Sequence, residues 1–302
     1  MRRLASASLL ALLACCASRR PSEPPPREPP PRVLAVGLDT VSLRANAYVD
    51  LHAWLATTPG PQGLDAAAEA YRNALAEDDR DELFARTLSS LSACATDRCA
   101  KTALASTAFS KPFGDTLATY VARDWTDRAA TARAAIEIAR AALGPESDAL
   151  LHRAARDLAI DLPAEPIAVD VVVDAPSPKR DALVPVALAV HGACFAKSDG
   201  VERVQDARII DCVLYRALRA QRTRSRLGIA LERELGLEKG ARAWDVVVIH
   251  AVAAIVTSWE PKHQSPLRRS ANAVEPKLLA WLAEHWPEEP AELAWHIARI
   301  ER

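Results

Sequence analysis

Apolar residues recur at helical spacing over residues 46–160. In the first of these segments Tyr48, Leu51 and Leu55 fall on one helical face. Breaks at Gly60, Pro61 and Gly63, and at Gly144 and Pro145, divide the region into several helices. Further helices are expected from Asp65, over residues 83–91, from Asp127 through Leu143, and from Ser147 or Asp148.

The period then changes from helical to alternating. Residues 167–173 alternate in polarity and are rich in β-branched side chains, which predicts a strand. Residues 183–191 predict a second strand, and Pro185 favours an edge position for it because proline cannot donate a hydrogen bond to a neighbouring strand. A polar loop follows from Gly192 to Gly200.

Helical patterns return over residues 203–221 and 225–236. Residues 243–259 are almost entirely apolar, but Asp245 and His250 interrupt them, and about 17 residues are marginal for a membrane span. A buried core helix is therefore expected, although the run of valines leaves a strand open. Two amphipathic helices, about 271–285 and 289–300, complete an α+β fold that is predominantly helical with a small inserted sheet.

The N-terminal segment has the pattern of a lipoprotein signal peptide. Arg2 and Arg3 precede an apolar stretch, residues 4–14, that is too short to span a membrane. It ends in Leu-Leu-Ala-Cys, which resembles the lipobox recognised by the lipoprotein signal peptidase. Residues 1–14 are thus expected to be removed and Cys15 to be lipidated; an ordinary secretory signal or an uncleaved anchor is the alternative.

A proline-rich segment follows the predicted lipidation site. Seven of the sixteen residues in 17–32 are proline, a composition that favours an extended polyproline II spacer of about 50 Å. We therefore expect residues 15–34 to be a tether that holds a domain, residues 35–302, away from the membrane. A ligand for a proline-recognition domain is the alternative for this segment.

Composition and charge restrict the partners. Half of the residues are apolar, a quarter are charged, and the formal net charge is −1, as in an ordinary globular protein. The basic run at residues 219–226 is too short for a nucleic-acid footprint, and we interpret it as a solvated helix end and loop. The expected partners are the membrane, through the lipid on Cys15, and an unidentified protein or peptide, but no nucleic acid.

Four of the six cysteines lie in the predicted domain. In an oxidising compartment these four could form two disulfides. Proximity along the chain favours Cys94 with Cys99 and Cys194 with Cys212, although four cysteines allow three pairings. A metal site is the alternative, but the spacing lacks the Cys-x2-Cys pairs of zinc knuckles.

Common catalytic motifs are absent from the sequence. There is no HExxH, no GxSxG, no P-loop and no GxGxxG. No two of the seven histidines are three or four residues apart, so no helix carries a pair of imidazoles suited to a metal. A Ser/His/Asp triad could still assemble from distant residues. The sequence therefore predicts no metal, no cofactor and no local catalytic motif.

Several stretches resemble a family of secreted or lipid-anchored bacterial proteins with a gluzincin-type zinc-peptidase fold. Residues 49–55 stand where that family has a Val-Asn-x-His-His-Phe-Leu-like helix and retain His52 as a possible functional residue. Tyr120 and Trp125 are similar to its Tyr-x4-Trp element, and residues 162–173 to its proline-bearing strand. The resemblance covers about residues 46–260 and implies a zincin-like fold.

The resemblance breaks down at the zinc motif. The family's HExxH aligns with Tyr215 to Arg219, so that Tyr215 and Arg219 replace the histidine ligands and Arg216 replaces the general base. The third ligand falls near Ala254. Because zinc needs lone-pair donors and arginine offers only N–H groups, Arg216 and Arg219 cannot bind the metal, and the side chain of Ala254 has no donor atom at all. We expect Tyr215 and Arg219 to be ordinary packing and surface residues, and contact with an anionic partner group is the alternative.

We therefore expect a non-catalytic lipoprotein of the cell envelope, in which a degenerate zinc-peptidase-like domain serves as a binding or structural module. Because the residue after Cys15 is cysteine rather than aspartate, the usual sorting rule implies the outer membrane, facing the periplasm or the cell surface. The alternatives are an active envelope hydrolase with a non-standard site, and a helical interaction domain unrelated to peptidases.

Overall fold

The structure is a computed structural model of the whole chain, and it describes residues 31–37, 39–57, 63–76, 80–175, 188–196, 202–286 and 289–301. The predicted signal peptide, Cys15 and nearly all of the predicted tether lie outside the described residues. The folded part begins slightly earlier than expected, because Val33 and Leu34 already belong to a strand. The carbonyl of Arg32 accepts a hydrogen bond from the Ala47 N–H, 2.8 Å away, which fixes this end of the chain to the domain.

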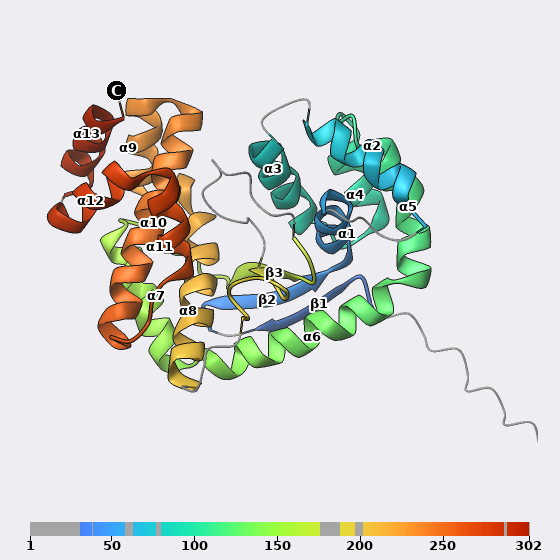
Figure 1. The fold of residues 1–302 in the computed structure, drawn as a ribbon, viewed down its shortest axis with the longest axis horizontal. Coiled ribbons are helices and arrows are strands. Elements are labelled where there is room, and N and C mark those ends of the chain that lie inside the picture. The colour runs from blue at the N-terminus through green and yellow to red at the C-terminus, as the bar shows by residue number, and fades with distance from the viewer. Residues whose placement is uncertain are drawn as a thin grey trace, which may run out of the picture.

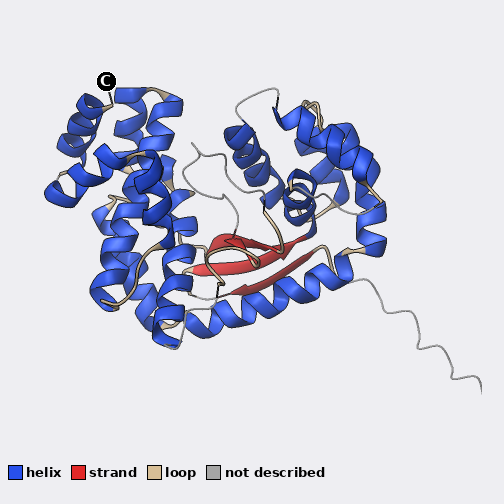
Figure 2. Cartoon of the chain, in the orientation of Figure 1, coloured by secondary structure: helices blue, strands red, loops and turns tan. Residues whose placement is uncertain are grey.

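Two groups of helices flank a small central sheet (Figure 1, Figure 2). The first group is α1 (Ala47–Ala56), α2 (Asp65–Ala76), α3 (Arg80–Ser92), α4 (Asp97–Leu104) and α5 (Ser110–Arg123). The second is α7 (Pro145–Asp157), α8 (Glu202–Arg219), α9 (Arg226–Leu235), α10 (Leu237–Trp259), α11 (Pro266–Val274), α12 (Pro276–His285) and α13 (Pro290–Ile300). Helix α6 (Trp125–Ala142) runs along the sheet from one group to the other. The described fold is thus α+β and mostly helical, as the sequence predicted.

The sheet is mixed, with the strand order β1-β2-β3-β4. Strand β1 (Val33–Gly37) pairs antiparallel with β2 (Val41–Asn46), whereas β3 (Ile167–Val172) is parallel both to β2 and to β4 (Leu188–Ala189). The predicted second strand is described only from residue 188 and lies at an edge of the described sheet, as expected. Pro185 lies outside the described residues.

The prediction of an inserted sheet was wrong in one respect. Two of the four described strands come from residues 33–46, before the first helix. The alternation of Val41, Leu43 and Ala45, all buried, is the expected period of a strand with one face toward the core. This short hairpin was not predicted, because it directly follows the prolines and its first residues were assigned to the tether.

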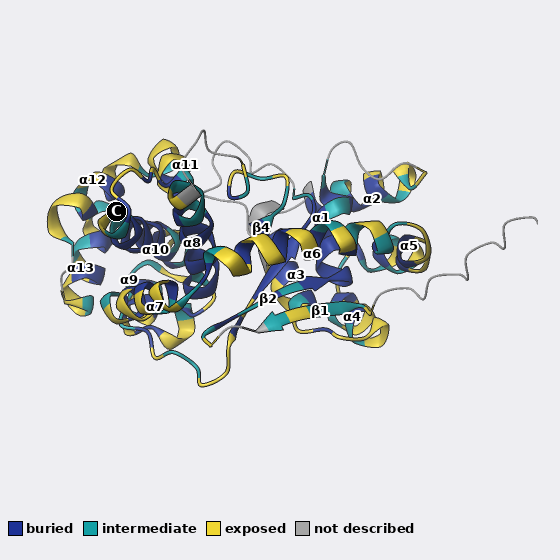
Figure 3. Cartoon of the chain, turned by 90° about the horizontal axis from the view of Figure 1, so that it is seen from below, coloured by how far each residue is buried: buried dark blue, intermediate teal, exposed yellow. Residues whose placement is uncertain are grey.

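Helix α6 covers one face of the sheet with small side chains. Its buried face consists largely of alanine, as at Ala129, Ala132 and Ala139, whereas its other face is exposed (Figure 3). Alanine has the highest helix propensity and lets the helix backbone approach the strands closely. The sheet and α6 therefore pack closely against each other between the two helical groups.

The apolar segment near residue 250 is a core helix. Helix α10 is, among the described helices, the one long and apolar enough to cross a membrane by length and composition. However, 72% of its apolar window is buried inside the fold, and Val246 through Ala253 are each buried. The expectation of a core helix is confirmed, and the helix begins at Leu237, earlier than the pattern indicated.

The predicted helix over residues 271–285 is instead two helices, α11 and α12, which meet at Glu275. Pro276 is the first residue of α12. Proline has no N–H to continue α11, but its fixed φ suits the first turn of a new helix. The proline therefore ends one helix and begins the next.

Both expected disulfides are present. Cys94 pairs with Cys99 between α3 and α4, and Cys194 pairs with Cys212. The second bond joins the segment after β4 to α8. The Cα atoms lie 5.4 Å and 6.0 Å apart, within the usual range for a disulfide.

Candidate functional site

A buried carboxylate on α1 organises a polar cluster beside the end of β3. Oδ1 of Asp50 accepts hydrogen bonds from the Val173 backbone N–H at 2.7 Å and from Nη2 of Arg128 at 3.2 Å. Its Oδ2 accepts from the Tyr120 hydroxyl at 2.7 Å and from Nε of Arg128. Asp50 is almost fully buried, so these bonds replace the water that an ionised carboxylate requires.

Arg128 of α6 links the buried Asp50 to the partly exposed Asp174. Its Nη1 donates to Oδ2 of Asp174 at 3.0 Å, and its guanidinium carbon lies 4.2 Å from the centre of the Trp54 ring. Burial by itself would lower the pKa of Arg128, but the charge of Asp50 and the hydrogen bond to it raise that pKa further. Arg128 therefore stays cationic and holds two carboxylates at once.

Asp174 and His191 form the exposed end of the cluster. Asp174 follows β3 and His191 follows β4, and Nδ1 of His191 lies 2.8 Å from Oδ1 of Asp174. Burial tends to raise the pKa of Asp174, but the hydrogen bonds from His191 and Arg128 outweigh it and the pKa is lowered. Because an ionised carboxylate only accepts, Nδ1 is the donor in this hydrogen bond. The side chain of His191 is 65% exposed and that of Asp174 is 32% exposed.

The backbone around His191 is held on both sides. The N–H groups of Val190 and His191 donate to the carbonyls of Val172 and Val173, at 2.8 and 3.2 Å. Three residues later, the Cys194–Cys212 disulfide ties the segment to α8. An exposed histidine would ordinarily sample several rotamers, but here both its backbone and its ring are fixed. We refer to Asp50, Tyr120, Arg128, Asp174 and His191 as the Asp50 cluster.

The Asp50 cluster can accept a proton but is a poor metal site. The described residues contain no group of three or more His, Cys, Asp or Glu side chains that could hold a metal ion. The carboxylates of Asp50 and Asp174 and the guanidinium of Arg128 together leave one excess negative charge. A fixed imidazole with a carboxylate on Nδ1 and a lone pair on Nε2 is the arrangement of a general base and the group that orients it.

The positions aligned with the zinc motif form a link between α8 and α10 instead. Nε and Nη2 of Arg219 donate to the two carboxylate oxygens of Asp245, at 2.7 and 2.9 Å. The indole Nε1 of Trp244 donates to the Arg219 carbonyl at 2.9 Å. Tyr215 is buried beside them, and burial together with the negative charge of Asp245 raises its pKa. These residues pack the two helices against each other.

The other two positions aligned with the zinc motif, Arg216 and Ala254, do not form a metal site with Tyr215 and Arg219. Arg216 is buried, its guanidinium carbon lies 5.2 Å from the centre of the Tyr215 ring, and burial lowers its pKa to about 10. Ala254 is nine residues beyond Asp245 on α10, which is about two and a half helical turns. It therefore lies on the opposite face of α10 from the side chain that contacts Arg219. The structure brings Tyr215 and Arg219 to α10 but does not bring Ala254 to them.

His52 is part of the core of the first helical group. Its Nε2 lies 3.0 Å from the Phe84 carbonyl, its Nδ1 contacts the Tyr71 hydroxyl, and its ring stacks on Phe84. Since the carbonyl can only accept, Nε2 carries the proton and Nδ1 accepts from the tyrosine. Burial lowers the pKa of His52 to about 4, so the ring is neutral at pH 7. Both ring nitrogens are occupied, and the side chain has a structural role.

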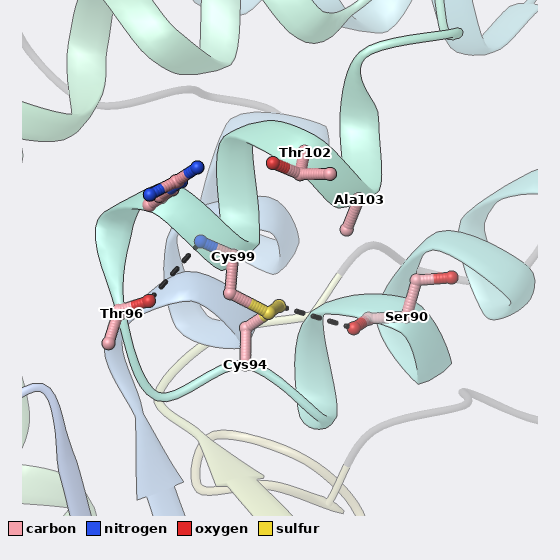
Figure 4. A pocket seen from close by; sticks show the side chains of 7 residues that line it. Ser90, Cys94, Thr96, Cys99, Thr102 and Ala103 are labelled. Carbon is pink, nitrogen blue, oxygen red and sulfur yellow. Dashed lines mark hydrogen bonds between the residues drawn. A yellow bond between two sulfur atoms is a disulfide. The ribbon is translucent and has the colours of Figure 1, made fainter.

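A shallow, open hollow lies beside the Cys94–Cys99 disulfide (Figure 4). Thr96 caps α4 there, because its hydroxyl accepts from the Cys99 N–H at 3.2 Å. The hollow is lined by Ser90, Cys94, Thr96, Arg98, Cys99, Thr102 and Ala103. Arg98 is the one charged residue among them, so the hollow has no pair of groups for acid–base chemistry, and we interpret it as the surface of a disulfide-linked helix junction.

Sequence reasoning missed the most distinctive pair, Asp174 and His191. Asp174 directly follows the predicted strand over residues 167–173, and His191 ends the predicted strand over residues 183–191. The carboxyl ends of adjacent parallel strands lie at the same edge of a sheet, which is where ligands of α/β sheets commonly bind. That rule could have brought the two residues together. Nothing local in the sequence indicates that Arg128 and Asp50 support them.

The chain matches no protein-family model, no curated protein and no solved structure. The packing of α8 against α10 meets one condition of the zinc-peptidase resemblance, but the position of Ala254 does not fit it. The zincin-like kinship therefore stays a prediction, and the function must be argued from the residues.

Proposed function

We propose that this chain is a lipid-anchored protein of the cell envelope whose helical domain serves as a binding or structural module for a protein or peptide partner. The observation that carries the location is the pairing of all four cysteines of the domain in two disulfides. Such bonds persist outside the cytoplasm and are rare within it. The sequence pattern at residues 1–15 supports a lipid on Cys15, and Cys16 at the next position supports attachment to the outer membrane.

Adjacent cysteines allow a matched test of the anchor. Cells that express the full chain are labelled with a radioactive fatty acid, and the label on the protein is measured together with its partition between membrane and soluble fractions. We expect Cys15→Ala to lose the label and to block processing, whereas Cys16→Ala keeps both. Equal labelling of wild type and Cys15→Ala would refute the proposed anchor.

The proposal that the domain is not a zinc peptidase rests on the Arg219–Asp245 pair. Each group is already the hydrogen-bonding partner of the other, and guanidinium groups repel a divalent cation. Metal analysis of the purified full-length protein, alongside a protease assay on unfolded casein, tests this. We expect neither stoichiometric zinc nor chelator-sensitive cleavage, and finding both would show that a metal site exists elsewhere.

A second candidate, an envelope hydrolase with a non-standard site, is favoured by one observation. His191 is exposed, its ring is oriented by Asp174, and its backbone is fixed by strand pairing and a disulfide. This candidate is compatible with the proposed location and with the absence of zinc chemistry.

A further inference from the structure

Two described histidines contact a carboxylate, and His191 is the exposed one. Nε2 of His263 lies 3.3 Å from Oδ2 of Asp211, but each of those two side chains is only 1% exposed. His52 is enclosed in the core, and Nδ1 of the exposed His285 contacts a backbone carbonyl, that of Trp281, at 2.9 Å. Nδ1 of His191 instead contacts a carboxylate, which stabilises the imidazolium that forms when Nε2 takes up a proton. Within the described residues Nε2 of His191 forms no hydrogen bond, and the side chain is 65% exposed.

We propose that His191 is the general base of a metal-free esterase site, oriented by Asp174, in which water attacks a neutral carboxylic ester. This inference rests on the second candidate function above and assigns its residues, reaction type and substrate class. His191 is the catalytic residue, and Asp174 and Arg128 are positioning residues.

The step balances with water as the only co-reactant. Nε2 of His191 takes a proton from a water molecule while the water oxygen forms a bond to the ester carbonyl carbon. The tetrahedral intermediate then collapses, and the bond from this carbon to the alcohol oxygen breaks. The imidazolium returns its proton to the departing alkoxide, which leaves a carboxylic acid, an alcohol and the neutral histidine.

The charge of the Asp50 cluster selects the substrate class. Asp50, Arg128 and Asp174 together carry one excess negative charge beside His191, which repels phosphate esters and other anions. An amide is a harder substrate, because its amine leaving group departs only after protonation. A neutral ester carries no charge for the cluster to repel, and its alcohol leaving group departs more readily than an amine.

Asp174 is held in place by side chains that are themselves buried in the fold. Arg128 holds Oδ2 of Asp174 at 3.0 Å, and Asp50 fixes Arg128 through two further hydrogen bonds. Arg128 is itself 11% exposed and has a carboxylate on each side. The Asp174 carboxylate is therefore linked through Arg128 of α6 to Asp50 of α1 and does not depend on its own loop alone, and precise placement is what a general base requires.

The test uses the full-length protein purified in a detergent that contains no ester, with p-nitrophenyl acetate as the probe. Release of p-nitrophenol is followed for wild type, His191→Ala and the matched control His285→Ala. We expect His191→Ala to lose about 100-fold in kcat/KM, at the lower end of the range for a positioned general base. His285→Ala should retain the wild-type rate. Equal rates for all three proteins would overturn the proposal, because any exposed imidazole would then account for the background.

Two further measurements separate a catalytic role from a structural one. Imidazole added to the solution should restore part of the rate of His191→Ala but should not accelerate the wild type by the same factor. Asp174→Asn should lower kcat at least tenfold while KM changes little, since the carboxylate acts on the base and not on the ester. Failure of rescue, or a change confined to KM, would overturn the assigned roles. Fatty-acid labelling of Cys15 and metal content are independent of these rates, so failure here leaves the proposed location and non-zinc character intact.

Discussion

Asp50 connects four segments of the chain through a single carboxylate. Its partners are Tyr120 on α5, Arg128 on α6 and the backbone of Val173 after β3, while Asp50 itself lies on α1. Burial and the neighbouring negative charge raise the pKa of Tyr120, so this hydroxyl remains a donor at all ordinary pH values. The carboxylate is thus fully satisfied, and its loss would leave several buried donors without an acceptor.

We predict that Asp50→Ala lowers the free energy of unfolding by about 3–5 kcal/mol, the usual effect of breaking a buried ion pair by removing one partner. Urea unfolding followed by circular dichroism measures this change. The control is Asp115→Ala, which removes the exposed ion pair with Lys111 and should leave the unfolding midpoint unchanged. A similar, small effect at both positions would contradict the role assigned to Asp50.

His52 gives the fold a dependence on pH. Burial lowers its pKa to about 4 in the folded protein, whereas an unfolded chain binds this proton near the ordinary histidine pKa of about 6.5. Between these values the unfolded state binds more protons, so stability is complete above about pH 6.5 and falls as the pH decreases toward 4. His250, whose pKa burial also lowers to about 4, adds to the same trend.

The His52 contribution can be isolated by comparing urea unfolding at pH 7 and pH 4.5. We predict that wild type loses about 2–3 kcal/mol more over this interval than His52→Gln does, because each unit of pKa difference corresponds to about 1.4 kcal/mol. His52→Gln should also be less stable than wild type at pH 7, since Tyr71 and the Phe84 carbonyl lose a well-placed partner. An identical pH dependence in both proteins would show that the ring titrates freely in the folded state.

At the scale of elements, α8 and α10 are antiparallel partners joined at one end by Arg219 and Asp245. The two side chains are 27% and 14% exposed and form two parallel hydrogen bonds, which makes the pair stronger than a surface ion pair. From the sequence, Arg219 was expected to occupy a degraded zinc site, whereas no role was expected for Asp245. Their geometry gives them a different role, the alignment of two core helices.

A double-mutant cycle measures that role. We predict that Arg219→Ala and Asp245→Ala each destabilise the protein and that their coupling energy is about 1–2 kcal/mol, as for partly buried bidentate pairs. The corresponding cycle on Arg140 and Glu137, an exposed pair on α6, should give a coupling near zero. Fully additive effects at 219 and 245 would mean that the two helices align without this contact.

The elements differ in how far the sequence could predict them. Helices such as α1 and α6 and strand β3 were recognised because a single period dominates each segment. Helix α10 was recognised from an almost entirely apolar run, which left a strand open and did not show where the helix begins. The hairpin β1–β2 was missed because it is short and follows the prolines directly. The Asp50 cluster was missed because Asp50, Arg128 and Asp174 are about 50 to 125 residues apart, and only the packing of α1 and α6 on the sheet brings them together.

At the scale of the molecule, the sheet and α6 lie between the two helical groups and join them (Figure 1). One of the two disulfides lies within a helical group, and the other links the sheet to a helical group. Cys94–Cys99 closes a loop of 5 residues within the first group. Cys194–Cys212, with a separation of 18, links the sheet edge that carries His191 to α8 in the second group. The longer loop should lose more chain entropy when it is closed in the unfolded state.

The two bonds should therefore be unequal both in stability and in their effect on the site. By loop length alone, we predict a loss of about 3 kcal/mol for the Cys194→Ala/Cys212→Ala protein and about 2 kcal/mol for Cys94→Ala/Cys99→Ala. Urea unfolding of the two double variants, both with and without reductant, measures this, and reductant should destabilise each variant only by the amount of its remaining bond. Because the longer loop holds the segment that carries His191, only its removal should also reduce ester hydrolysis at temperatures where both variants are folded. If removal of the Cys94–Cys99 bond reduced that rate equally, the disulfide beside His191 would have no special part in positioning the imidazole.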